Sequence, residues 1–383
     1  MSSPLSGDAR QQLDRLAADG AETVPAIVDL ILSQARQSRV SDVHLTPSAE
    51  ALLMDWRIDG VLHDVYAFPE SLKPNIVARL KVASELLTYR TDVPQEGRIR
   101  DGRPGEVRVS TFPTVHGERA VIRLFADPGK LFRLHDLGLT PSVADELSRS
   151  LNQSGGAILI SGPAGSGKTT TAYACLREIV ATSDERRSVV SLEDPVESLI
   201  HGVAQSQIRP ASGFDYPTGL RSLMRQDPEV IFVGEIRDRP TAEIVLQAAL
   251  SGHLVLTTFH AGSAAGAIGR LLDMGIEPFQ VRSGVRAILS QRLLRTLCEC
   301  RGRQLGGCES CRGTGYVGRR PIAEVLTTDE SSTGKAIIAR EDASEIGRRA
   351  EAAGMIPLRR NAEDALALGL VDEAEITRVL GCR

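Results

Sequence analysis

Gly162-Pro163-Ala164-Gly165-Ser166-Gly167-Lys168-Thr169 is the stretch that decides the fold of this 383-residue chain. A glycine, four residues and then Gly-Lys-Thr make up the nucleotide P-loop pattern without a mismatch. The apolar run at 157–161 before it is typical of a buried parallel strand, and residues 170–180 after it form a helical pattern. Strand, loop and helix in this order are the context that the motif requires. The sequence therefore predicts a site for a nucleoside triphosphate.

The residue types of this stretch explain how it can hold phosphate. Glycines let the backbone curl, so that successive N–H groups face phosphate oxygens at the positive end of the following helix. Lys168 can reach the β- and γ-phosphates, and Thr169 can place its hydroxyl on Mg²⁺. We expect all eight residues of the motif, together with Thr170 in the first turn of the helix, to contact bound ATP.

Composition disfavours several classes of protein. Acidic residues outnumber basic ones by 49 to 45, whereas nucleic-acid-binding domains usually carry a basic excess. The sequence contains no apolar run of about eighteen residues that could span a membrane, and its first twelve residues lack the apolar segment of a secretion signal. We therefore expect a cytoplasmic protein that does not bind nucleic acid. Four of the six cysteines lie between Cys298 and Cys311, and such clustering in a cytosolic chain favours a metal site over disulfides.

The order of apolar segments divides the chain into two domains. We expect a polar tail or a frayed helix at 1–23, an α+β domain at 24–126, a linker rich in glycine and proline at 127–142, and a second domain at 143–383. In the first domain, the patterns predict helices at 24–36 and 74–87, strands at 42–45, 52–57, 106–112 and 119–125, and a turn at Asp59-Gly60. In the second, helices alternate with strands at 157–161, 188–192, 230–233 and 253–258, and a mostly helical part follows residue 329. This alternation around a P-loop predicts an α/β domain with a doubly wound parallel sheet.

Two further strands of the predicted sheet end in carboxylates. Glu193-Asp194-Pro195-Val196-Glu197 follows the strand at 188–192, and Glu235 follows the strand at 230–233. Ligands bind at the carboxyl ends of such strands. Gly234 stands where many P-loop enzymes carry a magnesium-binding aspartate, so Glu235 is left to polarise a water or to hold the hydration shell of the metal. Whether Glu193 or Glu235 is the catalytic base stays open.

Taken together, the motifs resemble those of the secretion ATPase superfamily, the ring motors of bacterial type II secretion and type IV pilus assembly. The P-loop, the acidic segment at 193–197, Val-Gly-Glu-Ile-Arg-Asp at 233–238 and the pair His253 and His260 follow the order of its Walker A, Asp box, Walker B and His box. In isolation, two histidines at the ends of a buried strand are more often structural than catalytic. The resemblance continues into the first domain, for example in Arg-Ile-Asp-Gly at 57–60, and covers about residues 24–383.

The resemblance implies a RecA-like P-loop ATPase domain preceded by a smaller α+β, PAS-like domain. It also implies that arginines of the first domain close onto the nucleotide phosphates; Arg108 and Arg123 occupy the matching positions, and Arg98 is a weaker third. A guanidinium suits this task because it is planar, always charged and able to bind phosphate oxygens bidentately. His260 joins the candidate catalytic residues through the His box, and Glu235 joins Thr169 as an expected magnesium contact.

The clustered cysteines resemble the tetracysteine zinc loop of the assembly-type members of this superfamily. Four thiolates around Zn²⁺ make a closed, tetrahedral structural site, and the matching residues are Cys298, Cys300, Cys308 and Cys311. The first pair is Cys-x-Cys, one residue shorter than the usual Cys-x-x-Cys, so less chain is available to wrap one ion. We expect a zinc site here, and free thiols in a glycine-rich loop are the alternative.

The activity that the resemblance implies is Mg²⁺-dependent hydrolysis of ATP by a cytoplasmic homo-hexamer at the inner face of the bacterial inner membrane. Its motion is expected to drive assembly of a type II secretion pseudopilus or a type IV pilus. The expected partner is an inner-membrane platform protein, with membrane association through partners only. We expect a short form without the N-terminal platform-binding domain of larger members. The alternatives are a pilus retraction motor, although these generally lack the cysteine cluster, and an ATP-binding scaffold with little turnover; net charge disfavours a DNA translocase.

Overall fold

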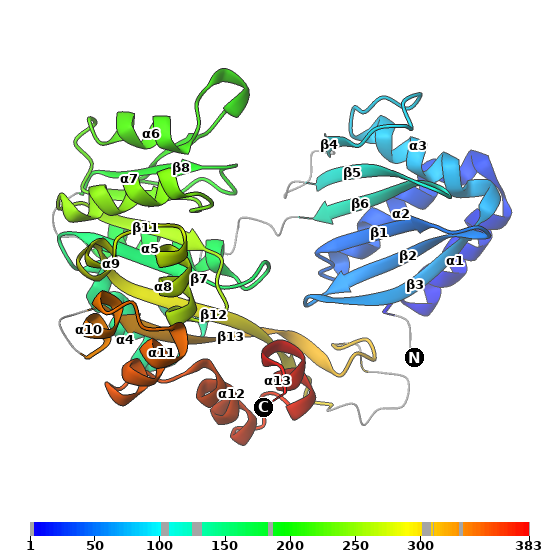
Figure 1. Cartoon of the computed structure of the whole chain (residues 1–383). Coiled ribbons are helices and arrows are strands. Elements are labelled where there is room, and N and C mark those ends of the chain that lie inside the picture. The colour runs from blue at the N-terminus through cyan, green and yellow to red at the C-terminus, as the bar shows by residue number, and fades with distance from the viewer. Residues whose placement is uncertain are drawn as a thin grey trace. The chain divides into compact units, whose positions relative to one another are not determined.

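The structure, a computed structural model, describes residues 4–100, 107–124, 132–182, 187–300, 308, 310–328 and 332–382. The chain forms two compact units (Figure 1). The first comprises Met1–Lys130 with Arg295–Gly318, and the second comprises Leu131–Leu294 with Arg319–Arg383. The cysteine-bearing segment thus groups by its contacts with the first unit, whereas the sequence assigns it to the second domain. Residues 127–131 of the expected linker lie outside the described part of the chain.

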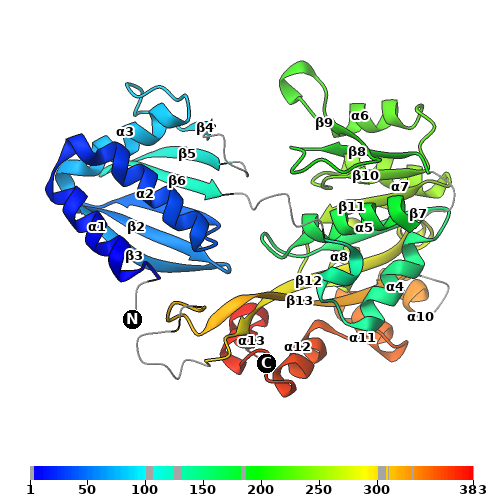
Figure 2. The ribbon, with the colours of Figure 1, turned by 180° about the vertical axis from the view of Figure 1, so that it is seen from behind.

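The first unit is built on a six-stranded antiparallel sheet of order β3-β2-β1-β6-β5-β4. Its strands are β1 Asp42–Pro47, β2 Ala51–Ile58, β3 Val61–Pro69, β4 Gln95–Ile99, β5 Val107–Thr114 and β6 Gly117–Leu124. Its helices are α1 Gly7–Ala18, α2 Val24–Gln37 and α3 Lys73–Ala83. α1 and α2 cover one face of the sheet (Figure 2), and there Ile31, Trp56 and Phe68 belong to one buried apolar cluster.

Two helices of the first unit bear on the sequence expectations. Residues 7–18, expected to form either a frayed helix or part of a polar tail, form α1, which buries Ala9 and Leu13 in the core. These two apolar residues, one turn apart, fix a helix whose other positions are mostly polar. α3 ends at Ala83, before the expected residue 87. Glu85 has a left-handed backbone with φ of +60°, which cannot continue the helix, and the Ser84 hydroxyl caps the end by donating to the Leu80 carbonyl.

The second unit is built on a seven-stranded sheet of order β13-β12-β7-β11-β10-β8-β9. Pairing is parallel at each step from β12 to β9. The strands are β7 Gly156–Ser161, β8 Val189–Glu193, β9 Ala204–Gln207, β10 Val230–Val233, β11 Leu254–Phe259, β12 Val285–Leu297 and β13 Tyr316–Thr327. The α/β class and the parallel sheet that the sequence predicts are confirmed.

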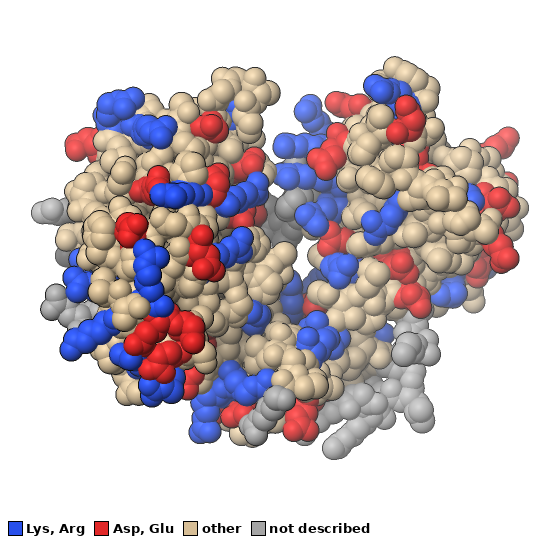
Figure 3. Space-filling model, in the orientation of Figure 1, with Lys and Arg blue, Asp and Glu red and all other residues tan. Residues whose placement is uncertain are grey.

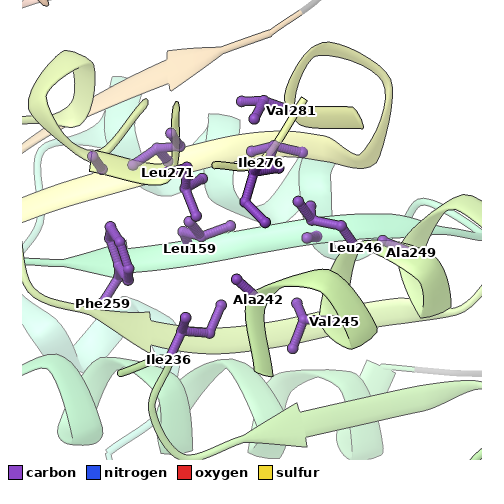
Figure 4. Packing of buried hydrophobic residues seen from close by; sticks show 14 of the residues in the cluster. Leu159, Ile236, Ala242, Val245, Leu246, Ala249, Phe259, Leu271, Ile276 and Val281 are labelled. Carbon is purple, nitrogen blue, oxygen red and sulfur yellow. The ribbon is translucent and has the colours of Figure 1, made fainter. Parts of the chain in front are cut away.

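Helices cover both faces of this sheet, as a doubly wound fold requires (Figures 1 and 2). α4 Pro141–Leu151 and α5 Lys168–Thr182 pack on one face, and α7 Arg239–Leu250, α8 Ala264–Asp273 and α9 Pro278–Gly284 pack on the other. Leu159 of β7, Val245 of α7 and Leu271 of α8 belong to one buried apolar cluster on this face of the sheet (Figure 4). The remaining helices are α6 Tyr216–Leu223, α10 Ser332–Ile338, α11 Ala343–Ala352, α12 Leu358–Ala367 and α13 Glu373–Leu380. Within the described ranges, none of the helices combines the length and apolar character needed to traverse a bilayer.

Three strands of the second sheet, β9, β12 and β13, are not among those that the sequence predicts. β12 is the most consequential, because it lies directly beside β7, with Ser290 opposite Ser161 at the start of the P-loop. Polar residues, including Gln291 and Arg292, interrupt its apolar residues, so that no continuous run marks it as a buried strand. The second sheet therefore brings a polar strand against the nucleotide motif.

Candidate active site

The P-loop connects the end of β7 to the first turn of α5. Gly162 and Gly167 have φ of +152° and +87°, a backbone region that favours glycine. A Cβ atom at Gly162 would also come within 2.6 Å of the Gln291 carbonyl oxygen, which leaves no space for a side chain. Residues 163–165 at the tip of the loop are exposed, whereas Ser166 and Lys168 are buried. The backbone at the tip is thus accessible to a ligand.

Lys168 is held by the loop that it belongs to. Its ammonium group donates hydrogen bonds to the carbonyls of Gly162, at 3.0 Å, and Pro163, at 2.9 Å. Burial lowers the pKa of Lys168; the Glu235 carboxylate acts in the opposite direction, and Arg292 adds to the lowering. A phosphate bound at the loop would supply further negative charge and favour the charged lysine.

Glu235 lies just beyond β10, with a nitrogen atom close to each of its carboxylate oxygens. Oε1 is 2.8 Å from His260 Nε2, and Arg237 Nε donates to Oε2 at 2.8 Å. The Glu235 side chain is 18% exposed. Burial lowers the pKa of His260, and the charge of Lys168 lowers it further, whereas Glu235 raises it. Lys168, Glu235 and His260, which the sequence selects from three separate motifs, therefore lie in one electrostatic neighbourhood.

Glu193, the other candidate base, has a different environment at the end of β8. Its side chain is 2% exposed. The carboxylate accepts hydrogen bonds from the Tyr173 hydroxyl, from the Ser191 hydroxyl at 2.5 Å and from the Gln205 amide at 3.1 Å. Burial raises the pKa of Tyr173, as does its hydrogen bond to Glu193. Neutral donors thus occupy both oxygens of Glu193.

Two residues of β12 that the sequence analysis did not select bear on the P-loop: Gln291 contacts it, and Arg292 acts on Lys168 through its charge. The Gln291 amide donates to the Ser166 carbonyl at 2.6 Å and accepts from the Thr171 hydroxyl at 2.9 Å. Arg292 follows on the opposite face of the strand, is half-buried, and contributes to the lowered pKa of Lys168. No local pattern shows that β12 pairs with β7. The polar dipeptide within an apolar segment is the one signal that points to these residues.

In the first unit, charged residues form a row across five neighbouring strands. The register places these residues opposite one another in turn: Arg98, Arg108, Arg123, Asp42 and Arg57. Arg123 Nε is 2.8 Å from Asp42 Oδ1, and its side chain is 61% exposed. Lys and Arg side chains gather on the side of the unit where β4, β5 and β6 lie (Figure 3). The register thus places three arginines on adjacent strands, and guanidinium groups are suited to binding an anion.

The four cysteines that the sequence selects for zinc lie together, although residues 301–307 and 309 between them are outside the described part. Their Sγ atoms are all within 4.8 Å of one another, and the Sγ atoms of Cys298 and Cys308 are 3.4 Å apart. Sulfurs at about 2.3 Å from a tetrahedral ion lie about 3.8 Å apart. Burial acts to raise the pKa of Cys311, but backbone hydrogen bonds at Cys308 and Gly315 outweigh it and lower the pKa to about 6. The donor set therefore fits zinc, which binds thiolate.

Comparison with known proteins places these motifs in a family. The family model described as "Type II/IV secretion system protein" matches residues 17–378. The chain belongs to this family. Type II secretion system protein HxcR of Pseudomonas aeruginosa is 38% identical over 384 residues, which cover 98% of this chain and 81% of the relative. Type II secretion system ATPase E of Vibrio cholerae is 39% identical over 353 residues, which cover 85% of this chain and 70% of the relative.

A solved structure supports the fold of this secretion-system family member. The crystal structure of the pilus retraction motor PilT with bound ADP matches with a TM-score of 0.62 and 25% identity, over 91% of this chain and 95% of that chain. The predicted resemblance to the secretion ATPase superfamily is confirmed, and so is its fold, a RecA-like α/β domain preceded by an α+β domain.

Proposed function

We propose that this chain is a Mg²⁺-dependent ATPase motor of type II secretion or type IV pilus assembly. It is an ATPase: its P-loop is complete, and a relative of 39% identity is named as one. The observation that carries the proposal is the grouping of Glu235 and His260 beside Lys168. These are a carboxylate, a proton-exchanging ring and a phosphate-binding cation, which together suit hydrolysis of a phosphoanhydride.

Positioning and charge neutralisation account for most of the catalysis of phosphoryl transfer. The N–H groups of the P-loop and Lys168 bind and orient the phosphates. Thr169 and Glu235 are the residues that would hold Mg²⁺, and the ion would supply positive charge against the phosphate oxygens. Arg108 and Arg123 of the arginine row are assigned to the charge that develops during the reaction.

We assign the orientation of the attacking water to Glu235 rather than to Glu193. Glu235 is partly exposed and its carboxylate is fixed by His260 and Arg237. The lowered pKa of His260 keeps its ring neutral at pH 7, so that one N–H can donate to the carboxylate and hold its orientation. Glu193, by contrast, is 2% exposed, and three protein donors already surround its carboxylate.

Phosphate release by the purified chain with MgATP tests this proposal. We expect measurable turnover in the wild type and a loss of at least about 100-fold in Lys168→Ala, because the ammonium group is the principal side-chain charge on the phosphates. Lys335→Ala removes an exposed lysine from α10 of the same unit and serves as the control. Wild-type protein that binds ATP but releases no phosphate would instead support the alternative function, an ATP-binding scaffold with little turnover.

The proposed working form is a cytoplasmic homo-hexamer that reaches the inner membrane through a platform protein. Light scattering of the wild type with and without nucleotide measures the oligomer, and co-purification with a platform protein measures the attachment. A nucleotide-saturated monomer that is fully active would contradict the ring.

The likeness to PilT favours a retraction motor as the second candidate function. Loss of the gene should abolish fibres if the chain is an assembly motor and leave excess fibres if it is a retraction motor.

We further propose that Cys298, Cys300, Cys308 and Cys311 hold a structural zinc ion. Protein purified without chelator should contain about one zinc per chain, and the double variant Cys308→Ser, Cys311→Ser should contain none and melt at a lower temperature. Cys382→Ser, at an exposed cysteine outside the cluster, is the control. Metal-free wild type with four titratable thiols in the cluster would favour the alternative of free cysteines.

A further inference from the structure

Gln291 has a buried side chain that is hydrogen-bonded at both ends. It is 1% exposed. Its Nε2 donates to the Ser166 carbonyl at 2.6 Å, and its Oε1 accepts from the Thr171 hydroxyl at 2.9 Å. A carbonyl oxygen only accepts, so the nitrogen of the amide must be the atom that faces Ser166. One side chain of β12 therefore contacts the P-loop backbone and the first turns of α5 at the same time.

The contact with Ser166 determines how the next peptide group points. In a trans peptide, the carbonyl of one residue and the N–H of the following residue point in opposite directions. With its carbonyl bound by Gln291, the peptide between Ser166 and Gly167 directs the Gly167 N–H away from β12. In a P-loop, N–H groups of this kind bind the phosphates. Gly167 also has a positive φ of +87°, a conformation from which a glycine can easily rotate unless a neighbour holds it.

The contact with Thr171 links this peptide to α5. The Thr171 backbone N–H bonds to the Gly167 carbonyl at 3.0 Å, and its hydroxyl bonds to Gln291. The two hydrogen bonds join the last residues of the loop, the start of the helix and β12. Loop geometry is then set before any ligand arrives, which reduces the ordering cost of binding.

We propose that Gln291 is a positioning residue for nucleotide binding: it presets the Ser166–Gly167 peptide so that the Gly167 N–H faces the phosphates. Loss of the amide lets the peptide rotate and weakens binding of ground state and transition state alike. Such a loss of uniform binding raises Kd and KM and leaves kcat nearly unchanged. The inference rests on nucleotide binding at the P-loop.

The test is Gln291→Met, which keeps length and volume but has no hydrogen-bonding amide. We expect the Kd for MgADP, measured by calorimetry, and the KM for MgATP to rise about tenfold, with kcat within about threefold of the wild type. Thr171→Val, which lacks the hydroxyl, should show part of this loss of affinity. Thr171→Ser, which keeps the hydroxyl, should bind MgADP as tightly as the wild type. Combined with Gln291→Met, Thr171→Val should add little, because both remove the same contact.

Asn361→Leu is the matched control, because it separates positioning from general stability. Asn361 is also a buried amide of the second unit, 5% exposed, and its Nδ2 donates to the Ala323 carbonyl at 2.9 Å. We expect this variant to melt at a lower temperature and to bind MgADP normally. If Gln291→Met changes Kd no more than Asn361→Leu does, Gln291 is only structural and the proposal is wrong. Failure of wild-type protein to bind MgADP would overturn the P-loop site itself, which is a separate result.

Discussion

The two sheets of this molecule carry charge in different places. In the parallel sheet, every residue of β7, β10 and β11 is buried, and the charged groups Lys168, Glu235 and His260 stand beyond the carboxyl ends of these strands. In the antiparallel sheet, buried residues of β5 alternate with half-buried or exposed ones from Val107 to Phe112, and the arginine row lies on paired residues of the strands themselves, next to one end of the sheet. Central strands that are covered on both faces, such as β7, β10 and β11, leave no exposed position for a charged side chain, whereas strands of a sheet with one open face do.

This difference decides what kind of site each sheet can build. Groups at strand ends sit on loops, where a short segment can wrap around one ligand. Groups on a sheet face are held at fixed spacing by the pairing of strands, so that the arginines form an extended surface rather than a pocket. The parallel sheet accordingly carries the candidate reaction centre, and the antiparallel sheet supplies a surface of positive charge.

The largest expected effect separates the two glutamates at the ends of parallel strands. Glu235→Gln should retain MgATP binding and lower kcat about 100-fold, because an amide no longer attracts the proton of the attacking water. Glu193→Gln should keep kcat within several-fold and lower the melting temperature, since it replaces an acceptor in a buried network of donors at a cost of about 1–2 kcal/mol. Phosphate release and thermal melting of both variants measure this. The reverse result, with Glu193→Gln inactive and Glu235→Gln active, would exchange the two roles.

A smaller effect is expected from the arginine row of the antiparallel sheet. Arg108→Gln and Arg123→Gln should each lower kcat at least about tenfold, because each removes charge that is assigned to the phosphates. Arg108 stands between Arg98 and Arg123 in the register. Steady-state kinetics with MgATP measure kcat for both variants and the wild type.

The matched control for the row is Arg119→Gln on the same strand as Arg123. Arg119 donates to His44 Nδ1 at 2.7 Å and lies outside the row, opposite Phe112. The variant Arg119→Gln removes one positive charge from β6, as Arg123→Gln does. Its kcat should nevertheless stay within about threefold of the wild type. Equal losses in Arg119→Gln and Arg123→Gln would show that only net charge matters, and the specific assignment of the row would fail.

The same difference explains how far the sequence could lead. The sequence could select the P-loop, Glu235 and His260 as candidate site residues because each lies in a contiguous motif at a strand end, and the structure brings Lys168, Glu235 and His260 near one another. The sequence alone does not show that these charged residues align in a row, because the alignment depends on the pairing of Asp42 with Arg123, which are far apart in the chain. Gln291 was missed for the same reason: only the pairing of β12 with β7 brings it to Ser166. Non-local register is the information that local patterns lack.

The smallest expected effect concerns pH and the antiparallel sheet. Burial lowers the pKa of His44, and the neighbouring charges of Arg119, Arg57 and Arg123 lower it further, with only Asp42 acting in the opposite direction. Unfolded His44 has an ordinary pKa near 6.5, so below that pH the unfolded chain binds more protons than the folded one. This contribution to stability is therefore complete above about pH 6.5 and is lost as the pH falls from there through the lowered pKa.

His44→Asn removes this titration but keeps an acceptor that can receive the Arg119 hydrogen bond. Urea unfolding at pH 7.0 and 5.5, followed by fluorescence, reports on the first unit, because Trp56 is the only tryptophan and is buried in its core. The wild type should lose more stability than His44→Asn between the two pH values. The difference should be less than about 1 kcal/mol, since the ring is only partly shielded from solvent. His116→Asn, in the exposed turn between β5 and β6, should behave like the wild type. The contrary result is that His44→Asn loses as much stability in acid as His116→Asn does. That result would show that burial and the neighbouring arginines do not disfavour protonation of His44. The electrostatic contrast between the two sheets would then be weaker than the arginine row indicates.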